Sequence, residues 1–472
     1  MKTDIVSFKS ITSSAAIHRL DAPVHMTDGV LTRKLISKSP YPLLTIKEVS
    51  QRVWHAGRWR RVYVTSPEHG ITLLGSSAIL KADLSREKLI SRKYTQEQED
   101  KKLEKGWTLI SCSGTIGNCA FANAQHAEKL ASQDVIRLKP NNILRGGLVY
   151  AYLASKYGYA MLTQGTFGSV IQHIEPQNVE SIPIPSFPES FQQEVDDLVQ
   201  EAARLREEAA DILDNADKKL KEKANLRELQ TGDYDYYGPR SSERKVFCFV
   251  RNSKDINTTT INAFNHSARI RQMKLLITCE KKPLKDILLN GDTFSTGSFP
   301  RVEVKEGNGV MLINQKDIFD TIVKGKWISK RKVKTDNLVE YGEVLIAGVG
   351  TLGESETFCR AIFANEDLVG QLVSGEFIRM KTTNEVPSGY LYAWLASDYG
   401  FRLIRNTQAG TKLCRPIPRL LLQIPVPIIE KADMEEIDRL VREAHTLRYK
   451  ANENERNAIR MVEQEIEKWN KH

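Results

Sequence analysis

The sequence predicts a mixed α/β (α+β) fold with two tandem, pseudo-symmetric globular domains, separated by two long helices that pair as an antiparallel coiled coil. Two observations predict this architecture. Several motifs occur twice, in the same order and at a nearly constant separation. Each set of motifs leads into a stretch without Gly or Pro, at 189–229 and at 433–469, and both stretches are longer than a helix of a globular domain needs to be.

The duplication covers most of the chain. YAYLASKYG at 150–158 matches YAWLASDYG at 392–400, which is a shift of 242 residues (392 − 150). Further pairs are IPIP at 182–185 with IPVP at 424–427, IRLK at 136–139 with IRMK at 378–381, GTIG at 114–117 with GTLG at 350–353, and Gly57–Arg61 with Gly297–Arg301. The shift changes slightly along the halves while the order is kept, as loop insertions produce. The repeat is therefore a duplicated domain.

The globular parts mix short strands and helices. Their strands are rich in β-branched and other apolar residues, and their helices are lined with Leu, Tyr and Ala. We expect strands at 61–64, 108–111, 344–347 and 375–380, and one helix each at 147–162 and 389–404. The glycine-rich segments at 113–117 and 348–353 are predicted to be tight turns between strands. A proline-rich exit stiffens the passage into each long helix.

Apolar residues in the long helices are spaced alternately three and four apart, which is the seam of a coiled coil. The expected seam residues are Val195, Leu198, Ala202, Leu205, Ala209 and Ile212 in the first helix, and Ile437, Leu440, Ala444, Leu447, Ala451 and Asn454 in the second. A helix of this length reaches about 60 Å. Asn454 replaces an apolar residue, and one polar seam position can fix the register. The alternative is that each helix packs only on its own domain.

These patterns predict five segments. The globular domains cover 1–188 and 246–429, and the long helices cover 189–230 and 430–472. Residues 231–245 have the composition of a linker.

Composition places the chain among soluble globular proteins. Its 472 residues fit several domains, and its net charge of +9 modestly favours a polyanionic partner. The six cysteines are scattered without metal-ligand spacing, so no metal site is expected and the thiols are expected to be reduced. No stretch is apolar enough for a signal peptide or a membrane span. We therefore expect a cytoplasmic protein that does not enter membranes.

The motifs of common DNA-acting enzymes are missing. The sequence contains no P-loop, no N/D-P-P-Y/F tetrapeptide of amino-methyltransferases and no H-E-x-x-H. The sequence therefore predicts no catalytic residues and no cofactor in this chain.

The order of motifs resembles the DNA specificity subunits of type I restriction–modification systems. In the first half these motifs are GRWRRVYV at 57–64, GITLLG at 70–75, GWTLISCSGTIG at 106–117, YLASKYG at 152–158, GTFGSVI at 165–171 and IPIP at 182–185, with RLDA at 19–22 near the start. The resemblance covers nearly the whole chain, twice. The second half departs from it in places, with Glu303 for Tyr63, Val349 for Ser113 and GTKLC at 410–414 for GTFGS.

This resemblance implies a non-catalytic subunit that binds double-stranded DNA. It implies two target-recognition domains, each reading one part of a split sequence, and a helix pair that acts as a spacer and docks two methyltransferase (modification) subunits. Those partners would hold S-adenosylmethionine and methylate adenine, and restriction (helicase-nuclease) subunits would use ATP and Mg²⁺ to cut DNA. Such systems serve phage defence. A half-site spacing of about one helical turn would present both domains to the same side of the duplex.

Basic segments supply the candidate DNA contacts, because Arg and Lys suit guanine edges and phosphates. The candidates are Arg58, Trp59, Arg60 and Arg61 in the first half and Arg301, Lys326, Lys330 and Arg331 in the second. Trp327 lies beside the second set.

Three alternatives remain open at this point. One is the specificity subunit of a related phage-defence system that methylates without cleaving. A second is a self-contained DNA-modifying nuclease, and a third is a duplicated coiled-coil adaptor.

Overall fold

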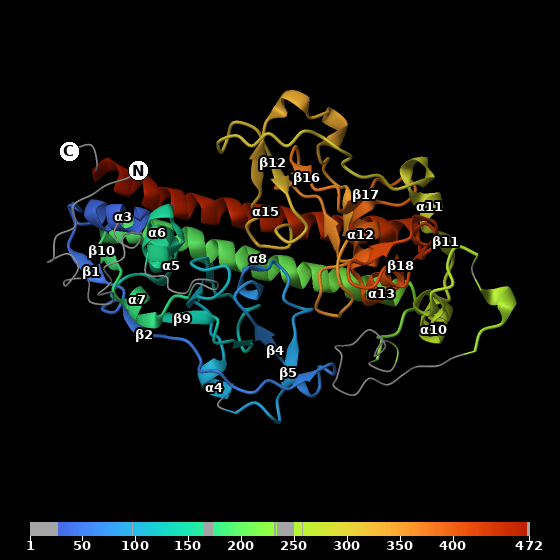
Figure 1. Ribbon diagram of the computed structural model, residues 1–472, viewed down its shortest axis with the longest axis horizontal. Coiled ribbons are helices and arrows are strands. Elements are labelled where there is room, and N and C mark those ends of the chain that lie inside the picture. Colours follow the sequence, from blue (N-terminus) through green and yellow to red (C-terminus); the bar gives the residue numbers. More distant parts are fainter. Residues whose placement is uncertain are drawn as a thin grey trace. The chain divides into compact units, whose positions relative to one another are not determined.

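The computed structural model describes residues 27–96, 98–164, 173–230, 233, 250–256 and 258–469 (Figure 1). By its contacts the chain divides into two compact units. Unit 1 comprises Met1–Glu207 with Lys450–His472, and unit 2 comprises Glu208–Tyr449. The motifs at 19–22 and 165–171 and most of the predicted linker lie outside the described residues.

The described residues of unit 1 form two four-stranded sheets. The first is antiparallel, with the order β2 (Ser50–Trp54), β9 (Val135–Pro140), β6 (Thr108–Ser111), β7 (Cys119–Phe121). The second has the order β3 (Tyr63–Val64), β5 (Leu89–Ser91), β4 (Gly70–Leu74), β8 (Leu130–Ala131), and its β4 and β8 are parallel. A short ladder joins β1 (Leu43–Thr45) to β10 (Pro183–Pro185). The described shorter helices of unit 1 are α3 (Asp28–Ile36), α4 (Gln98–Lys101), α5 (Gly146–Ala154), α6 (Lys156–Gln164) and α7 (Pro176–Glu180).

Unit 2 repeats this plan. One sheet has the order β15 (Ala361–Phe363), β14 (Val344–Ala347), β17 (Phe377–Met380), and the other has the order β13 (Lys326–Ile328), β12 (Val310–Ile313), β16 (Leu372–Val373), again with a parallel pair. β11 (Lys281–Pro283) pairs with β20 (Pro425–Pro427), and β18 (Gln408–Ala409) with β19 (Arg415–Pro416). Its helices are α10 (Ala268–Leu276), α11 (Leu284–Ile287), α12 (Ser388–Ala396), α13 (Asp398–Arg405) and α14 (Pro418–Leu421).

The central strands agree with the sequence expectation. β6 and β14 span the predicted 108–111 and 344–347, and all their residues are buried. β3 is shorter than the predicted 61–64, since pairing begins only at Tyr63. The glycine-rich segment after β6 is a turn, in which Gly114 and Gly117 have φ values of +78° and +79°.

The single helices expected at 147–162 and 389–404 are wrong, because each is broken at a serine. Ser155 has extended dihedrals (φ −65°, ψ 161°), and its hydroxyl donates to the Tyr152 carbonyl and accepts from the Gly158 amide. Ser397 repeats this geometry between α12 and α13. A Cβ on Gly158 would lie 2.3 Å from the Tyr152 carbonyl oxygen, so the tight break requires glycine there.

The long helices are α8 (Glu189–Lys223) and α15 (Lys431–Lys468). α8 ends earlier than the predicted residue 230, because Asn225 adopts a left-handed φ of +49°. The Leu226 amide then donates to the Lys221 carbonyl, and Leu226 is buried. This closure satisfies carbonyls that the last helical turn leaves without donors.

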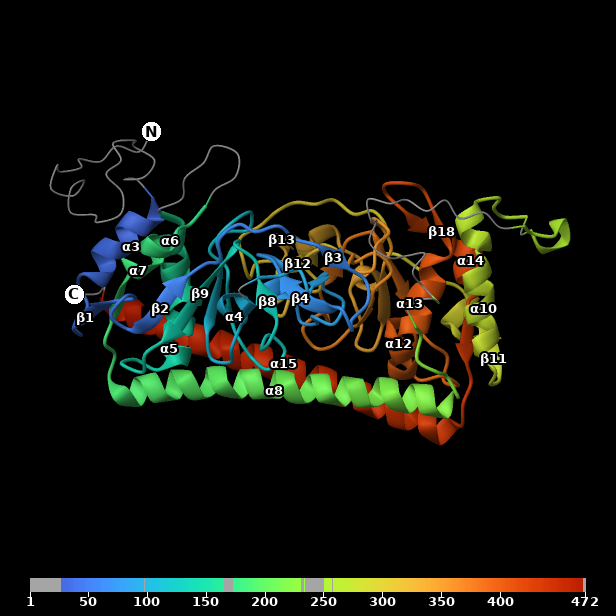
Figure 2. The same cartoon turned by 90° about the horizontal axis from the view of Figure 1, so that it is seen from below.

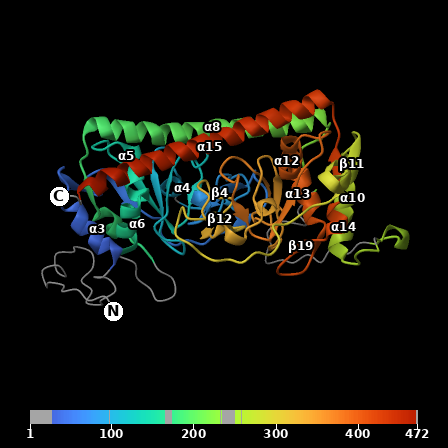
Figure 3. The same cartoon turned by 90° about the horizontal axis from the view of Figure 1, so that it is seen from above.

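Each unit has its own hydrophobic core, and both long helices contribute to it. In unit 1, Val195 and Val199 of α8 share a cluster with Ala458, Val462 and other residues of α15. In unit 2, Ala216 and Leu220 of α8 share one with Ile437 of α15. α5 lies between α8 and the sheet of unit 1 (Figure 2), and α12 packs on α15 in unit 2 (Figure 3). Helices with the length and apolar character of a bilayer span are absent from the described part of the chain.

Candidate DNA interface

The basic segment of unit 1 connects β2 to β3. Arg58 and Arg60 are exposed, and neither has a partner among the described residues. Arg61 instead points back into the protein, where it donates to the Gln133 side chain and lies 4.0 Å from the Asp134 carboxylate. The Trp59 ring is half-buried, with the Arg61 guanidinium and the Lys101 ammonium each 5.2 Å from its centroid. Arg61 and Trp59 therefore support the segment, whereas Arg58 and Arg60 face solvent.

The basic residues of unit 2 surround β13. Lys326 is exposed and paired with Glu303 at 2.5 Å, and Arg301 lies 5.8 Å from the ring of Phe299. Lys330 and Arg331 follow β13 on a short 3₁₀ turn that the Ser329 hydroxyl caps, and both side chains are exposed. Trp327 is half-buried on β13, opposite Met311. Of the four predicted cations, only Lys326 is held by a carboxylate within the described residues.

The predicted seam residues are all at least half-buried. The buried members are Val195, Ala202, Leu205, Ala209, Ile437, Leu440, Ala444 and Ala451. The half-buried members are Leu198, Ile212, Leu447 and Asn454. In unit 2 the helices are also linked by ion pairs of Lys219 with Glu436 and of Lys223 with Asp433. In these contacts the residue numbers rise along α8 while they fall along α15, so the two helices are antiparallel.

In unit 1 a buried polar layer joins the two helices, and the periodicity did not predict it. The Arg206 guanidinium lies 2.5 Å from the Glu455 carboxylate and donates to the Asn452 side chain at 2.9 Å. The Tyr150 hydroxyl donates to the same carboxylate at 2.5 Å. Burial, and after it the carboxylate, raises the pKa of Tyr150, so the phenol stays protonated as a donor. The sequence indicated a polar layer only through Asn454, a polar seam residue that lies between the buried Asn452 and Glu455 in the sequence.

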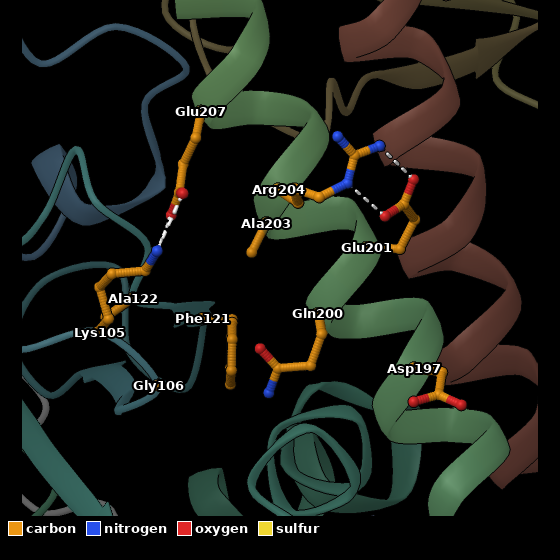
Figure 4. Close-up of a pocket in the computed structure, with 10 residues that line it drawn as sticks. All are labelled: Lys105, Gly106, Phe121, Ala122, Asp197, Gln200, Glu201, Ala203, Arg204 and Glu207. Atoms are coloured by element: carbon orange, nitrogen blue, oxygen red, sulfur yellow. Dashed lines mark hydrogen bonds and ion pairs between the residues drawn. The ribbon is translucent and has the colours of Figure 1, made fainter.

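A groove of about 730 Å³ runs along α8 in unit 1, and Figure 4 shows its lining. Its charged residues are largely paired. Lys105 reaches Glu207 at 2.8 Å, and Arg204 binds Glu201 through two contacts of 2.7 Å. With Asp197, the lining holds more carboxylates than cations. This groove is therefore electrostatically unsuited to DNA.

No cluster of three or more His, Cys, Asp or Glu side chains that could hold a metal ion occurs among the described residues. Several buried groups are held neutral. Burial lowers the pKa of His126 to about 4, and it raises the pKa of Cys112 to about 12.

Comparison with known proteins identifies a domain. Residues 74–231 match the family model of the type I restriction modification DNA specificity domain. None of the curated proteins matches the chain.

Three solved structures resemble the chain at low identity. A type I restriction-modification S subunit from M. genitalium is 12% identical, with 91% of this chain and 96% of that chain covered and a TM-score of 0.34. An HsdS subunit from Thermoanaerobacter tengcongensis is also 12% identical, with coverages of 92% and 98% and a TM-score of 0.28. A chain from a structure on assembly and conformational transition of the type I R-M system is 14% identical, with coverages of 91% and 98% and a TM-score of 0.28.

The matched domain model takes in residues 74–188 of the first globular domain and α8, and the same motifs return in the same order in unit 2. The described architecture, with two related units and an antiparallel helix pair, is the one that the motif order implied. Members of this family are generally non-catalytic. Residues 74–231 are therefore identified as a type I restriction modification DNA specificity domain.

Proposed function

We propose that this chain is a DNA specificity subunit that reads a split DNA sequence, with one part read by each unit. The observation that carries the proposal is that the duplication extends to individual contacts. The Gly147 amide of α5 donates to Asp196 of α8 at 2.7 Å, and the Gly389 amide of α12 donates to Asp438 of α15 at 2.7 Å. Two domains held on the helices by the same bond are suited to present equivalent surfaces to two half-sites.

Splitting the target between two domains gives useful specificity. Each mismatched base pair typically costs about 1–3 kcal/mol, and the penalties of well-separated positions add. One small domain that reads a few base pairs leaves many competing sites in a genome. Two such domains multiply their discrimination, provided that the helix pair holds their spacing.

The exposed cations are our candidates for the DNA contacts. Arg58 and Arg60 in unit 1, with Lys330 and Arg331 in unit 2, are exposed and have no ion-pair partner among the described residues. Arg301 is exposed as well, whereas Lys326 would first have to leave Glu303. Arg61 and Trp59 would act by supporting the segment that carries Arg58 and Arg60.

The remaining subunits would supply the chemistry. We place two methyltransferase subunits, holding S-adenosylmethionine, on the helix pair, and helicase-nuclease restriction subunits, using ATP and Mg²⁺, on that assembly. The complex would act in the cytoplasm.

A binding experiment tests this proposal. The chain is purified with its methyltransferase subunit, and its affinity is measured for a duplex that the complex methylates and for a scrambled duplex. We expect at least a thousandfold preference for the first duplex, as is typical of specific DNA-binding proteins. Arg60→Ala should weaken the binding, and Lys38→Ala is a control that removes a different exposed cation from unit 1. Equal affinity for both duplexes would contradict the proposal.

The chain alone, incubated with DNA, Mg²⁺, ATP and S-adenosylmethionine, separates this function from a self-contained enzyme. Cleavage or methyl transfer by the chain alone would favour the enzyme.

A further inference from the structure

Two basic turns, one in each unit, are copies of each other. KLISRKY at 88–94 aligns with KWISKRK at 326–332, a shift of 238 residues (326 − 88). The alignment joins Arg92 and Lys93 of unit 1 to Lys330 and Arg331 of unit 2. The first pair was not among the residues that the sequence singled out.

The backbone confirms the equivalence of the two turns. β5 runs antiparallel to β4, which runs parallel to β8, and β13 has the same relation to β12 and β16. The Ser91 amide donates to the Val62 carbonyl at 2.8 Å, and the Ser329 amide donates to the Val302 carbonyl at 2.9 Å. Both turns therefore leave an equivalent strand at an equivalent point.

Both turns are also anchored locally. In unit 1 the Arg92 amide donates to the His69 carbonyl at 3.0 Å, and the Gln98 side chain donates to the Arg92 carbonyl at 2.6 Å. In unit 2 the Val333 amide donates to the Lys330 carbonyl at 3.1 Å. The cations are thus carried on a backbone whose hydrogen bonds fix its path.

The side chains themselves are available. Arg92, Lys93, Lys330 and Arg331 are exposed, and none of them has a carboxylate partner in the described part of the chain. Tyr94 is 61% exposed, with the Lys93 ammonium 5.6 Å from its ring. Glu68 directly precedes His69 and is exposed. Among the described residues, its carboxylate makes no ion pair with Arg92 or Lys93. A pair of unneutralised cations on an anchored turn is suited to a polyanion.

We infer that these two basic turns bind the DNA phosphate backbone, one turn at each half-site. The inference rests on the proposed DNA-reading function and adds to it a contact that is independent of base sequence. Phosphate contacts set the position of a domain on the duplex, while other contacts read the bases. Duplication would then give the two domains the same docking point on their half-sites, and divergence elsewhere would let them read different sequences.

The test uses the chain in complex with its methyltransferase subunit and two double variants, R92Q/K93Q and K330Q/R331Q. Affinity is measured from 50 to 300 mM salt for a duplex that the complex methylates and for a scrambled duplex. Each lost phosphate contact lowers the slope of log affinity against log salt by about 0.9, so each variant should lose about 1.8. We expect a drop of about tenfold near physiological salt, by the same factor on both duplexes.

Three further measurements locate the contact. Phosphate ethylation interference should lose its signal in one half-site with R92Q/K93Q and in the other with K330Q/R331Q. The charge-conserving variant R92K/K93R should restore the wild-type slope. K105Q/R204Q, which removes two cations from the groove of Figure 4, should leave the slope unchanged.

The outcomes separate this inference from the proposed function. If the wild-type complex prefers its target but both double variants keep the wild-type slope, the phosphate contact is contradicted. The proposed function is not contradicted by this result. Loss on the target duplex without loss on the scrambled one would overturn it in favour of base reading. A wild-type complex with no preference for its target would contradict the proposed function.

Discussion

The two units bury an arginine at the same position of the same strand, yet its guanidinium donates to different groups in the two units. Arg379 of β17 donates to both carboxylate oxygens of Glu343 at 2.8 Å. Arg137 of β9 has no carboxylate partner among the described residues. Trp107 occupies the position of Glu343, at a shift of 236 residues (343 − 107), and Arg137 donates to backbone carbonyls, including that of Val135 at 3.0 Å. Burial lowers the pKa of Arg137 to about 10.

The helix pair shows a second difference of this kind. Glu455, which binds Arg206 and Tyr150 in unit 1, corresponds to Leu213 in unit 2 (213 + 242 = 455), and Leu213 packs at the edge of an apolar core. His445 of unit 2 corresponds to Ala203 of unit 1 and packs against Phe363 and Tyr392. The duplicated backbone therefore accepts either polar or apolar layers at equivalent positions. Its shape depends on the contacts that both units share.

Glu343→Ala should have the largest effect on this comparison. It leaves the fully buried Arg379 without its carboxylate, and breaking a buried ion pair in this way typically costs about 3–5 kcal/mol. The free energy of opening, measured by hydrogen exchange at β14 and β17 amides, should fall by that amount in unit 2 and stay unchanged in unit 1. Glu340→Ala, which removes an exposed partner of Lys381, is the control and should cost less than 1 kcal/mol. A loss below 1 kcal/mol for Glu343→Ala would show that the ion pair is unimportant.

Acid should weaken unit 1 through His126, which replaces the apolar Leu368 of unit 2 (126 + 242 = 368). Its pKa is about 4 when folded and about 6.5 when unfolded, so the unfolded chain binds the proton first as the pH falls. The contribution is full above pH 6.5 and is lost progressively towards pH 4, which amounts to about 3 kcal/mol. Hydrogen exchange of unit 1 at pH 7 and pH 4.5 measures the loss. His126→Leu should reduce the loss markedly, and an unchanged pH dependence would refute this assignment.

Glu455→Ala should have a somewhat smaller effect than Glu343→Ala. Arg206 would lose its carboxylate, but its side chain is 14% exposed and therefore regains some hydration. We expect a loss of about 2–3 kcal/mol in unit 1. Glu453→Ala removes a half-buried partner of Arg456 on the same helix and is the matched control. The double variant R206L/E455L should recover most of the loss, and a double variant as unstable as Glu455→Ala would speak against a buried ion pair.

The features that repeat in the chain were predictable from the sequence. The constant shift between YAYLASKYG and YAWLASDYG revealed the duplication, and the three–four spacing of apolar residues revealed both long helices. The breaks at Ser155 and Ser397 were not predicted, because apolar periodicity continues across them and only a serine–glycine contact ends the helix. The burial of Glu455 was missed because a glutamate on a helix is usually solvated. The turn at Arg92 was missed because its match to unit 2 is short and becomes convincing only when the strand pairing is known.

The most direct test of split recognition is the DNA sequence that the assembled complex modifies. Genomic DNA from cells that express the chain with its methyltransferase subunit is sequenced with a method that detects methylated adenine. If each unit reads one part of the target, we expect one motif made of two specified parts separated by a fixed number of unspecified bases. Substitutions of base-reading residues in unit 1 should change only one part. A continuous motif, or a change in both parts from substitutions in unit 1 alone, would contradict split recognition.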